Sequence, residues 1–289
     1  MFLVCAITGL LICYLESLAA KLIISFFFLA KLLAYSRSSG VELHYSKEND
    51  LFKEFDEKSK IKKMKFEPYL WAPHALQQGF FYLLSEKLYR WLYLNTFKRE
   101  YITLPDGGTI GLDWDGDIPN PADKPDKPYL LICPGLGGDS RNLYSLMLLW
   151  QARKQGYKCA TILARGAAGL PYTTPILHSA AKWRDIEFAL DYFYEKYGRD
   201  PKTKEKRTRI YAYGVSLGAQ LLSLYLGRAG KKTSEILDGA AVFSNVWNYS
   251  RSIPTFSSNF YGLYNYLIGI NLNNNIKKNQ LPNIKKVMP

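Results

Sequence analysis

Histidine and cysteine, the side chains that most often bind metal ions, are scarce in this sequence. The 289-residue chain has four cysteines and three histidines, His44, His74 and His178. The histidines lie far apart, and no spacing typical of a metal site joins them to cysteines or carboxylates. We therefore expect no bound metal and no other cofactor.

The four cysteines also lack the spacing of a disulfide framework. Cys5 and Cys13 lie in an apolar N-terminal stretch, whereas Cys133 and Cys159 lie in short apolar runs that are typical of core strands. Cysteine at such positions behaves as a small buried apolar side chain. We therefore expect unpaired thiols with a packing role.

Acidic residues are fewer than basic ones. The chain has 25 Asp and Glu and 38 Lys and Arg, which gives a formal net charge of +13. A basic chain can bind nucleic acid or an anionic membrane, or can simply have a basic surface. Zinc-ligand spacing, an RNA-binding aromatic strand and a continuous basic helix are all missing from the sequence, so we expect no nucleic-acid partner. A membrane is the favoured partner, and a generally basic surface is the alternative.

The N-terminal 36 residues are strongly apolar and favour a membrane anchor. The best window for a span is 17–35, where Lys21 and Lys31 lie near the ends and can reach the headgroups. A cleaved signal peptide is the alternative, but no Lys or Arg precedes the apolar run. We expect a single-pass N-terminal anchor at 1–36, with the membrane and the side left open.

Three further regions follow the expected anchor. Residues 37–97 form a charged connector and an aromatic helix from about Ala75 to Asn95, and residues 98–270 form the main domain. The tail at 271–289 is polar and rich in asparagine and lysine. Its composition predicts a solvated or disordered end.

Within 98–270, apolar runs alternate with amphipathic stretches. We expect strands at 101–104, 109–114, 129–133, 158–163, 207–213 and 237–244, with helices at 139–154, 180–197 and 217–226. Strands that alternate with helices build right-handed crossovers in a mostly parallel sheet with helices on both faces. The pattern therefore predicts an α/β fold.

The stretch Gly214-Val215-Ser216-Leu217-Gly218 matches the G-x-S-x-G pattern of a nucleophile elbow. In such an elbow a serine occupies a sharp, strained turn between a strand and a helix. Glycines two residues before and after the serine remove side chains that would clash. Because an expected strand precedes Ser216 and an expected helix follows it, we favour a nucleophile over a serine in an ordinary glycine-rich turn.

A second glycine-rich stretch, Cys133 to Gly138, follows a buried strand. Acyl transfer needs two backbone N–H groups directed at the developing oxyanion. We expect one from Leu217, the residue after the serine, and the other from Leu136. A phosphate-binding loop is the alternative, but the stretch lacks the patterns of the known phosphate loops.

The chain resembles the ABHD1/ABHD3-type branch of the α/β-hydrolases, which includes the YheT-like proteins. The resemblance runs from about residue 65 to 275. It rests on the elbow, the glycine stretch and several further motifs in order: Asp106-Gly107-Gly108 through Leu112-Asp113-Trp114, Arg165-Gly166-Ala167-Ala168-Gly169 with Thr174-Pro175 and Asp185, Tyr225-Leu226-Gly227, Phe243-Ser244 and Trp247-Asn248.

The resemblance implies a single-pass membrane protein with an α/β-hydrolase fold that hydrolyses lipid acyl esters of phospholipid or acylglycerol type. Relatives also transfer acyl groups to alcohols, so an acyltransferase is an alternative activity. The family fold continues beyond the equivalent of residue 289, and its further segments carry the acid and histidine of the triad. We accordingly expect the fold to be incomplete at its C-terminus.

The triad of such enzymes runs in the order Ser, acid, His along the chain. No histidine follows Ser216 in this sequence, and the only later acids are Glu235 and Asp238. His178 precedes Ser216, in an expected loop, and is more typical of a non-catalytic residue. Because a serine hydroxyl needs an adjacent base, we expect this chain to be inactive by itself. A non-catalytic membrane-bound pseudoenzyme or binding protein is the competing interpretation.

Overall fold

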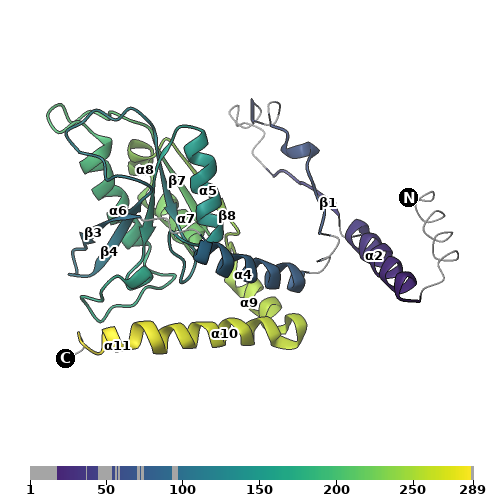
Figure 1. Ribbon diagram of the computed structural model, residues 1–289. Coiled ribbons are helices and arrows are strands. Elements are labelled where there is room, and N and C mark those ends of the chain that lie inside the picture. Colours follow the sequence, from purple (N-terminus) through teal and green to yellow (C-terminus); the bar gives the residue numbers. More distant parts are fainter. Residues whose placement is uncertain are drawn as a thin grey trace. The chain divides into compact units, whose positions relative to one another are not determined.

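The computed structural model describes residues 18–36, 38–44, 54–55, 57, 59–69, 72, 75–92 and 97–287. The chain divides into two compact units, Met1–Leu88 and Tyr89–Pro289. The elements of both are labelled along the ribbon in Figure 1. Residues 1–17 of the expected anchor lie outside the described residues, as do Cys5, Cys13 and His74.

The first unit contains helix α2, a pair of two-residue strands and most of helix α4. Helix α2 spans Leu18–Ser36, and the two-residue strands β1 (Ser39–Gly40) and β2 (Lys65–Phe66) pair in antiparallel register around the short helix η1 (Ile61–Lys63). Helix α4, Ala75–Leu92, begins in this unit and ends in the next. It agrees closely with the aromatic helix that the sequence predicts.

The expected membrane span at 17–35 needs correction. This segment does form a helix, α2, but within the described residues no helix has both the length and the apolar character needed to cross a membrane. Helix α2 has 19 residues, and Lys21 and Lys31 interrupt its apolar run. A span requires about 20 predominantly apolar residues.

The second unit is organised around a six-stranded mixed sheet. The strands follow the order β3-β4-β6-β5-β7-β8, so β3 and β8 form its two edges. The pairs β3–β4 and β4–β6 are antiparallel, whereas β6, β5, β7 and β8 run parallel to one another. The bounds are Lys98–Thr103 for β3, Thr109–Trp114 for β4, Tyr129–Cys133 for β5, Lys158–Leu163 for β6, Ile210–Val215 for β7 and Gly239–Phe243 for β8.

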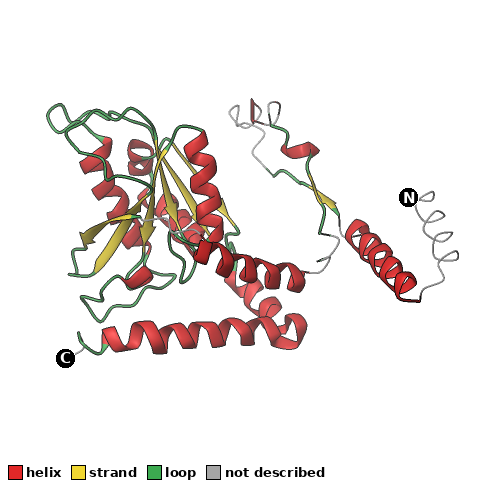
Figure 2. Ribbon diagram, viewed as in Figure 1, coloured by secondary structure: helices red, strands yellow, loops and turns green. Residues whose placement is uncertain are grey.

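Helices cover both faces of this sheet, as Figure 2 shows. On one face, buried side chains of α6, α7 and α8 pack against the strands in the larger core cluster. On the other face, Leu149 and Ala152 of α5 pack against Ile132 and Cys159. The helices span Leu143–Lys154 (α5), Trp183–Phe193 (α6), Leu217–Ala229 (α7) and Lys231–Ile236 (α8), with the single turns Ala167–Gly169 (η2) and Tyr194–Gly198 (η3). The predicted α/β architecture is confirmed.

Glu100 is the best-connected buried carboxylate of the core. It accepts hydrogen bonds from Trp114 Nε1 (3.0 Å), Tyr197 Oη (2.7 Å) and Tyr192 Oη (2.6 Å), and Lys196 Nζ lies 2.6 Å away. Burial alone would raise the pKa of Glu100, but these four donors hold it below its usual value. Glu100 is therefore a paired, structural anion that joins β3 to the end of α6.

The thiols of Cys133 and Cys159 are buried and unpaired, as the sequence predicts. Burial raises the pKa of each to about 12, so both remain protonated near neutral pH.

The C-terminal tail is helical, which corrects the expectation of a disordered end at 271–289. Helix α9 (Tyr249–Ser258) leads through η4 (Asn259–Gly262) to α10 (Leu263–Asn275), and η5 (Ile276–Gln280) and α11 (Leu281–Ile284) continue to the last described residues. Ile284 is buried at 6% exposure. Asparagine disfavours a helix only weakly, so an asparagine-rich composition does not exclude a helix here.

Candidate active site

Ser216 occupies the turn between strand β7 and helix α7. Its backbone has φ 52° and ψ −115°, a conformation that a residue with a side chain adopts at a cost. The Ser216 N–H donates to the Phe243 carbonyl at 2.9 Å, and its carbonyl accepts from Gln220 N–H at 3.1 Å. The side chain is exposed. The turn thus presents a strained, accessible hydroxyl at the carboxyl end of a central strand.

The glycines on either side of Ser216 allow an unusually close packing of backbone. A Cβ at Gly214 would lie 2.6 Å from Ala219 Cα, and a Cβ at Gly218 would lie 2.1 Å from the Cys133 carbonyl oxygen. Real Cβ atoms do not approach so closely. Both glycines are therefore required for helix α7 to begin directly against β5 and β7.

The loop Pro134–Gly138 lies directly against this turn. A Cβ at Gly135 would be 3.2 Å from Ser216 Cβ, so the loop and the serine are neighbours. The Gly135 N–H donates to Tyr144 Oη at 3.0 Å, and the Gly138 N–H donates to the Gly135 carbonyl at 2.9 Å. These bonds fix the loop around Leu136, whose side chain is 53% exposed.

Leu136 and Leu217 carry the two backbone N–H groups expected at the oxyanion. Within the described part of the chain, neither N–H group donates a hydrogen bond to a recorded partner. For Leu217 the reason is geometric, since the first N–H groups of a helix have no partner in that helix. The helix N-terminus also favours negative charge. Their role as oxyanion donors therefore stays a prediction.

A cavity of about 710 Å³ opens beside the glycine loop. Its wall includes Gly135 and Gly218, which flank the serine turn, but not Ser216 itself. Much of the remaining wall comes from the segment after β6, the start of α6 and the C-terminal helices: Arg165 to Leu170, Leu177, His178, Ile186, Leu272, Ile276, Gln280 and Asn283. This size falls within the range of small-molecule sites.

His178 lies in the wall of this cavity. Burial lowers its pKa, and the nearby Asp185 and Arg165 act in opposite directions on it, so the imidazole is neutral at pH 7. Its Nδ1 atom is buried and has no hydrogen-bond partner in the described structure. Within 97–287, no hydrogen bond joins His178 to Ser216.

The two acids that follow Ser216 do not approach it. Asp238 pairs with Lys206 at 2.7 Å and accepts a hydrogen bond from the Ile210 N–H at 2.8 Å. Ile210 is the first residue of β7, so Asp238 sits at the opposite end of the strand from Ser216. Glu235 is exposed on the short helix α8. Neither acid can orient a base at the serine.

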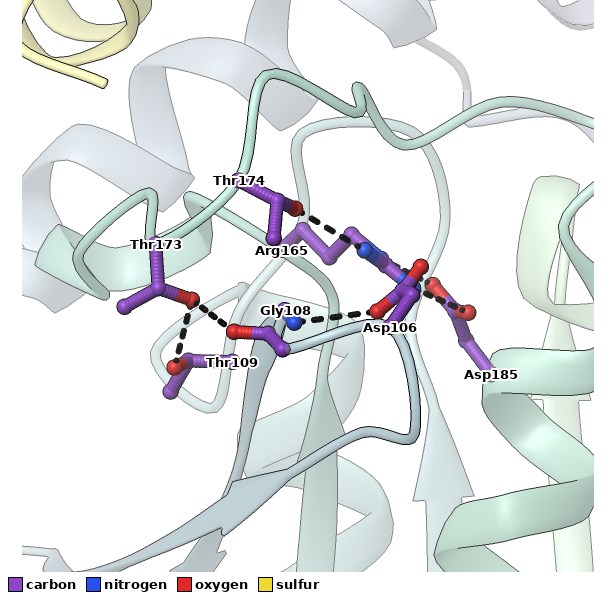
Figure 3. A network of polar contacts seen from close by, with 8 residues as sticks. Asp106, Gly108, Thr109, Arg165, Thr173, Thr174 and Asp185 are labelled. Carbon is purple, nitrogen blue, oxygen red and sulfur yellow. Dashed lines mark hydrogen bonds and ion pairs between the residues drawn. The ribbon is translucent and has the colours of Figure 1, made fainter.

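Arg165 organises the segment that forms one side of the cavity (Figure 3). Arg165 is 4% exposed, and its guanidinium pairs with both oxygens of Asp185, at 2.7 and 2.9 Å, and with Asp106 Oδ2 at 2.7 Å. The hydrogen bond from Arg165 lowers the pKa of Asp106. Thr173 adds a bond of 2.6 Å to the Gly107 carbonyl. The network ties the β3–β4 turn, the segment after β6 and helix α6 together.

A second buried carboxylate, Asp113 of β4, fixes the neighbouring backbone. Arg99 Nε donates to Asp113 Oδ1 at 2.6 Å, and Ser140 Oγ donates to Oδ2 at 2.6 Å. The same arginine donates to the Ala168 carbonyl at 2.7 Å. The sequence motifs contain Asp106, Asp113, Arg165 and Asp185, but nothing in their spacing predicts which of them pair.

Within the described residues, no group of histidine, cysteine and carboxylate side chains could hold a metal ion.

A strand order of 1-2-4-3-5-6, with a serine turn after the fifth strand, defines the class of the molecule as an α/β-hydrolase fold. Sequence comparison then gives particular relatives. The chain is 33% identical to the phospholipase ABHD3 of Mus musculus over 188 residues, which cover 64% of this chain and 43% of that protein. It is 27% identical to YheT of Escherichia coli over 143 residues, or 50% of this chain and 38% of YheT.

These relatives confirm the predicted resemblance to the ABHD3-type and YheT-like α/β-hydrolases. The chain spans less than half the length of either relative. No protein-family model matches it. Among solved structures, the Pyrococcus furiosus esterase Pf2001 shares 15% identity at a TM-score of 0.43, over 59% of this chain and 61% of the esterase.

Proposed function

We propose that this chain carries the acylation apparatus of a serine ester hydrolase that acts on lipid acyl esters. The observation behind the proposal is the strained turn at Ser216, held by Gly214 and Gly218 against the glycine loop. A curated relative named as a phospholipase supports the lipid ester as the substrate class.

In the proposed reaction, Ser216 Oγ attacks the ester carbonyl carbon and the carbonyl oxygen becomes an oxyanion. The N–H groups of Leu136 and Leu217 donate to that oxygen, and one such donor contributes about 10²–10³-fold to the rate. The alcohol leaves as the acyl-serine forms, and water then releases the fatty acid. The cavity beside the glycine loop would hold part of the lipid.

The hydroxyl proton of Ser216 must pass to a general base during the attack. Within 97–287 no histidine is recorded in hydrogen-bond contact with Ser216, and the only described histidine of this unit, His178, faces the cavity. We therefore propose that the chain alone turns over esters slowly, at the level that oxyanion stabilisation and binding supply, about 10³-fold over water.

An external base gives the direct test of this proposal. Free imidazole added to the 289-residue chain is expected to accelerate hydrolysis of a p-nitrophenyl ester beyond the reaction of imidazole in buffer. The Ser216→Ala variant should lose all of this extra rate, whereas Ser223→Ala, on the following helix, should keep it.

An equal response of both variants to imidazole would contradict the assignment of Ser216. That result would instead support the competing interpretation, a non-catalytic binding protein. The observation that favours this alternative is that, within 97–287, no histidine is hydrogen-bonded to Ser216. Hydrolysis and acyl transfer are separated by adding a long-chain alcohol, since a transferase forms the alkyl ester in place of free acid.

A further inference from the structure

The C-terminal helices leave an unusual amount of apolar side chain in water. From α9 to α10, seven large apolar residues are at least 41% exposed: Ile253, Tyr261, Leu263, Tyr266, Leu267, Ile268 and Ile270. Soluble monomers rarely expose large contiguous apolar patches without a function. We call the exposed side chains of Tyr249–Ile284 and the flanking lysines the C-terminal helical surface.

The charge of this surface has one sign. No acidic residue follows Asp238 in the sequence, although the chain has 25 in total. Arg251, Lys277, Lys285 and Lys286 are all exposed. A surface that combines apolar side chains with cations and has no anions is complementary to an anionic lipid interface.

Aromatic residues with a polar edge are concentrated in the same region. Trp247 is 77% exposed just before α9, and Tyr261 and Tyr266 are exposed at and after the turn between α9 and α10. Tryptophan and tyrosine favour the boundary between lipid and water, since one end of the side chain is apolar and the other is polar.

The same helices border the cavity beside the candidate active site. Leu272 of α10, Ile276 and Gln280 of η5 and Asn283 of α11 line it together with the glycine loop. A lipid layer against the outer side of these helices would therefore lie next to the cavity that is expected to receive the substrate. In Figure 1 these elements form the yellow-green end of the ribbon.

We propose that the C-terminal helical surface docks on an anionic lipid surface. A second copy of the chain is the other possible occupant, but a symmetric contact would bring the cations of one copy against those of the other. The docking does not depend on the chemistry of Ser216, so the Ser216→Ala variant should bind vesicles as the wild-type chain does. Failure of the docking and failure of the proposed function are thus distinguishable.

The first test measures flotation of the full chain with phosphatidylcholine vesicles that contain, or lack, about 30% phosphatidylserine. We expect binding to the anionic vesicles that weakens as salt is raised. Charge reversal should lower the partition coefficient about tenfold or more in the variant Lys277→Glu, Lys285→Glu, Lys286→Glu. The matched control reverses three other exposed lysines of the second unit: Lys124→Glu, Lys127→Glu, Lys202→Glu.

Helix α2 is also apolar and could bind vesicles by itself, so flotation does not locate the contact. The second test therefore follows a single position on α10. Cys5 and Cys13 are replaced by serine, and an environment-sensitive fluorophore is attached at Asn274→Cys on the exposed side of α10. A quencher carried by the lipid chains should quench this label. The same label at Asp123→Cys, in an exposed loop, should remain bright.

Two outcomes would overturn the proposal. One is equal vesicle binding by the two triple-lysine variants together with an unquenched label at position 274. The other is a dimer in light scattering that Ile268→Asp dissociates, without any binding to vesicles, which would assign the surface to a second copy of the chain.

Discussion

Ser216 is held in its strained conformation by residues that have no reactive group. A backbone conformation of this kind costs on the order of 1–3 kcal/mol and persists only where the surroundings impose it. Here the surroundings are the Phe243 carbonyl, which accepts the Ser216 N–H, and the close contact of Gly218 with the Cys133 carbonyl. The position of the hydroxyl therefore depends on Gly214 and Gly218, which have no side chain.

This dependence predicts that Gly218→Ala destabilises the fold. The added methyl group would lie 2.1 Å from the Cys133 backbone oxygen, which cannot rotate away, so we expect a loss of about 1–3 kcal/mol or more. Gly227→Ala is the matched control, because Gly227 lies in the same helix with nothing within 4 Å of the added Cβ. That variant should gain up to about 1 kcal/mol from helix propensity.

Urea unfolding followed by circular dichroism measures both free energies of unfolding. If the two variants shift the midpoint in the same direction and by the same amount, the close approach of α7 to β5 is not a constraint on the fold.

At the scale of elements, Arg165 joins three segments that are distant in sequence. It is 20 residues from Asp185 and 59 residues from Asp106, and it pairs with both. The segment between Arg165 and Asp185 contains His178 and Leu177 of the cavity wall and has little regular structure of its own. A buried network of ion pairs therefore holds this segment in place, whereas backbone hydrogen bonds between strands hold the sheet.

Replacing Arg165 by methionine should be strongly destabilising. It would leave two carboxylates, one of them buried, without their cation, and breaking a buried pair costs about 3–5 kcal/mol. Arg153→Met is the control, since Arg153 is 59% exposed in its pair with Asp115 and such pairs contribute about 0–1 kcal/mol. Chemical denaturation compares the two, and hydrogen exchange over 164–182 should show the loss of protection in the first variant only.

At the scale of the whole molecule, the two edges of the sheet differ. Edge strand β3 carries Lys98, Arg99 and Glu100, whereas edge strand β8 has the sequence Gly-Ala-Ala-Val-Phe without a charge. Ala240, Ala241 and Phe243 of β8 are exposed. An uncharged, apolar edge with free backbone groups can pair with another chain, so β8 is the expected site of self-association.

A lysine on this edge should slow aggregation of the full chain. Ala241→Lys places a charge on the exposed side of β8, where a second strand would have to bury it. Ala122→Lys adds the same charge in an exposed loop and serves as the control. Light scattering during heating should show delayed aggregation for the first variant alone; equal delay in both would mean that net charge, not the edge, governs association.

The sequence determined the parts of this protein that depend on short stretches of chain. Apolar runs with strand length predicted the core strands, and the G-x-S-x-G pattern predicted the turn at Ser216, because each reflects the conformation of neighbouring residues. The order of several such motifs was enough to indicate the family resemblance that the relatives confirm.

Tertiary structure decided the rest. The asparagine-rich composition of the tail predicts disorder, but the tail is helical and Ile284 is buried at 6% exposure. Arg165, Asp106 and Asp185 are visible as motif residues, yet their pairing follows only from the crossing of the β3–β4 turn with the segment after β6. Such contacts join residues far apart in the chain, so the path of the backbone in space must be known before they can be identified.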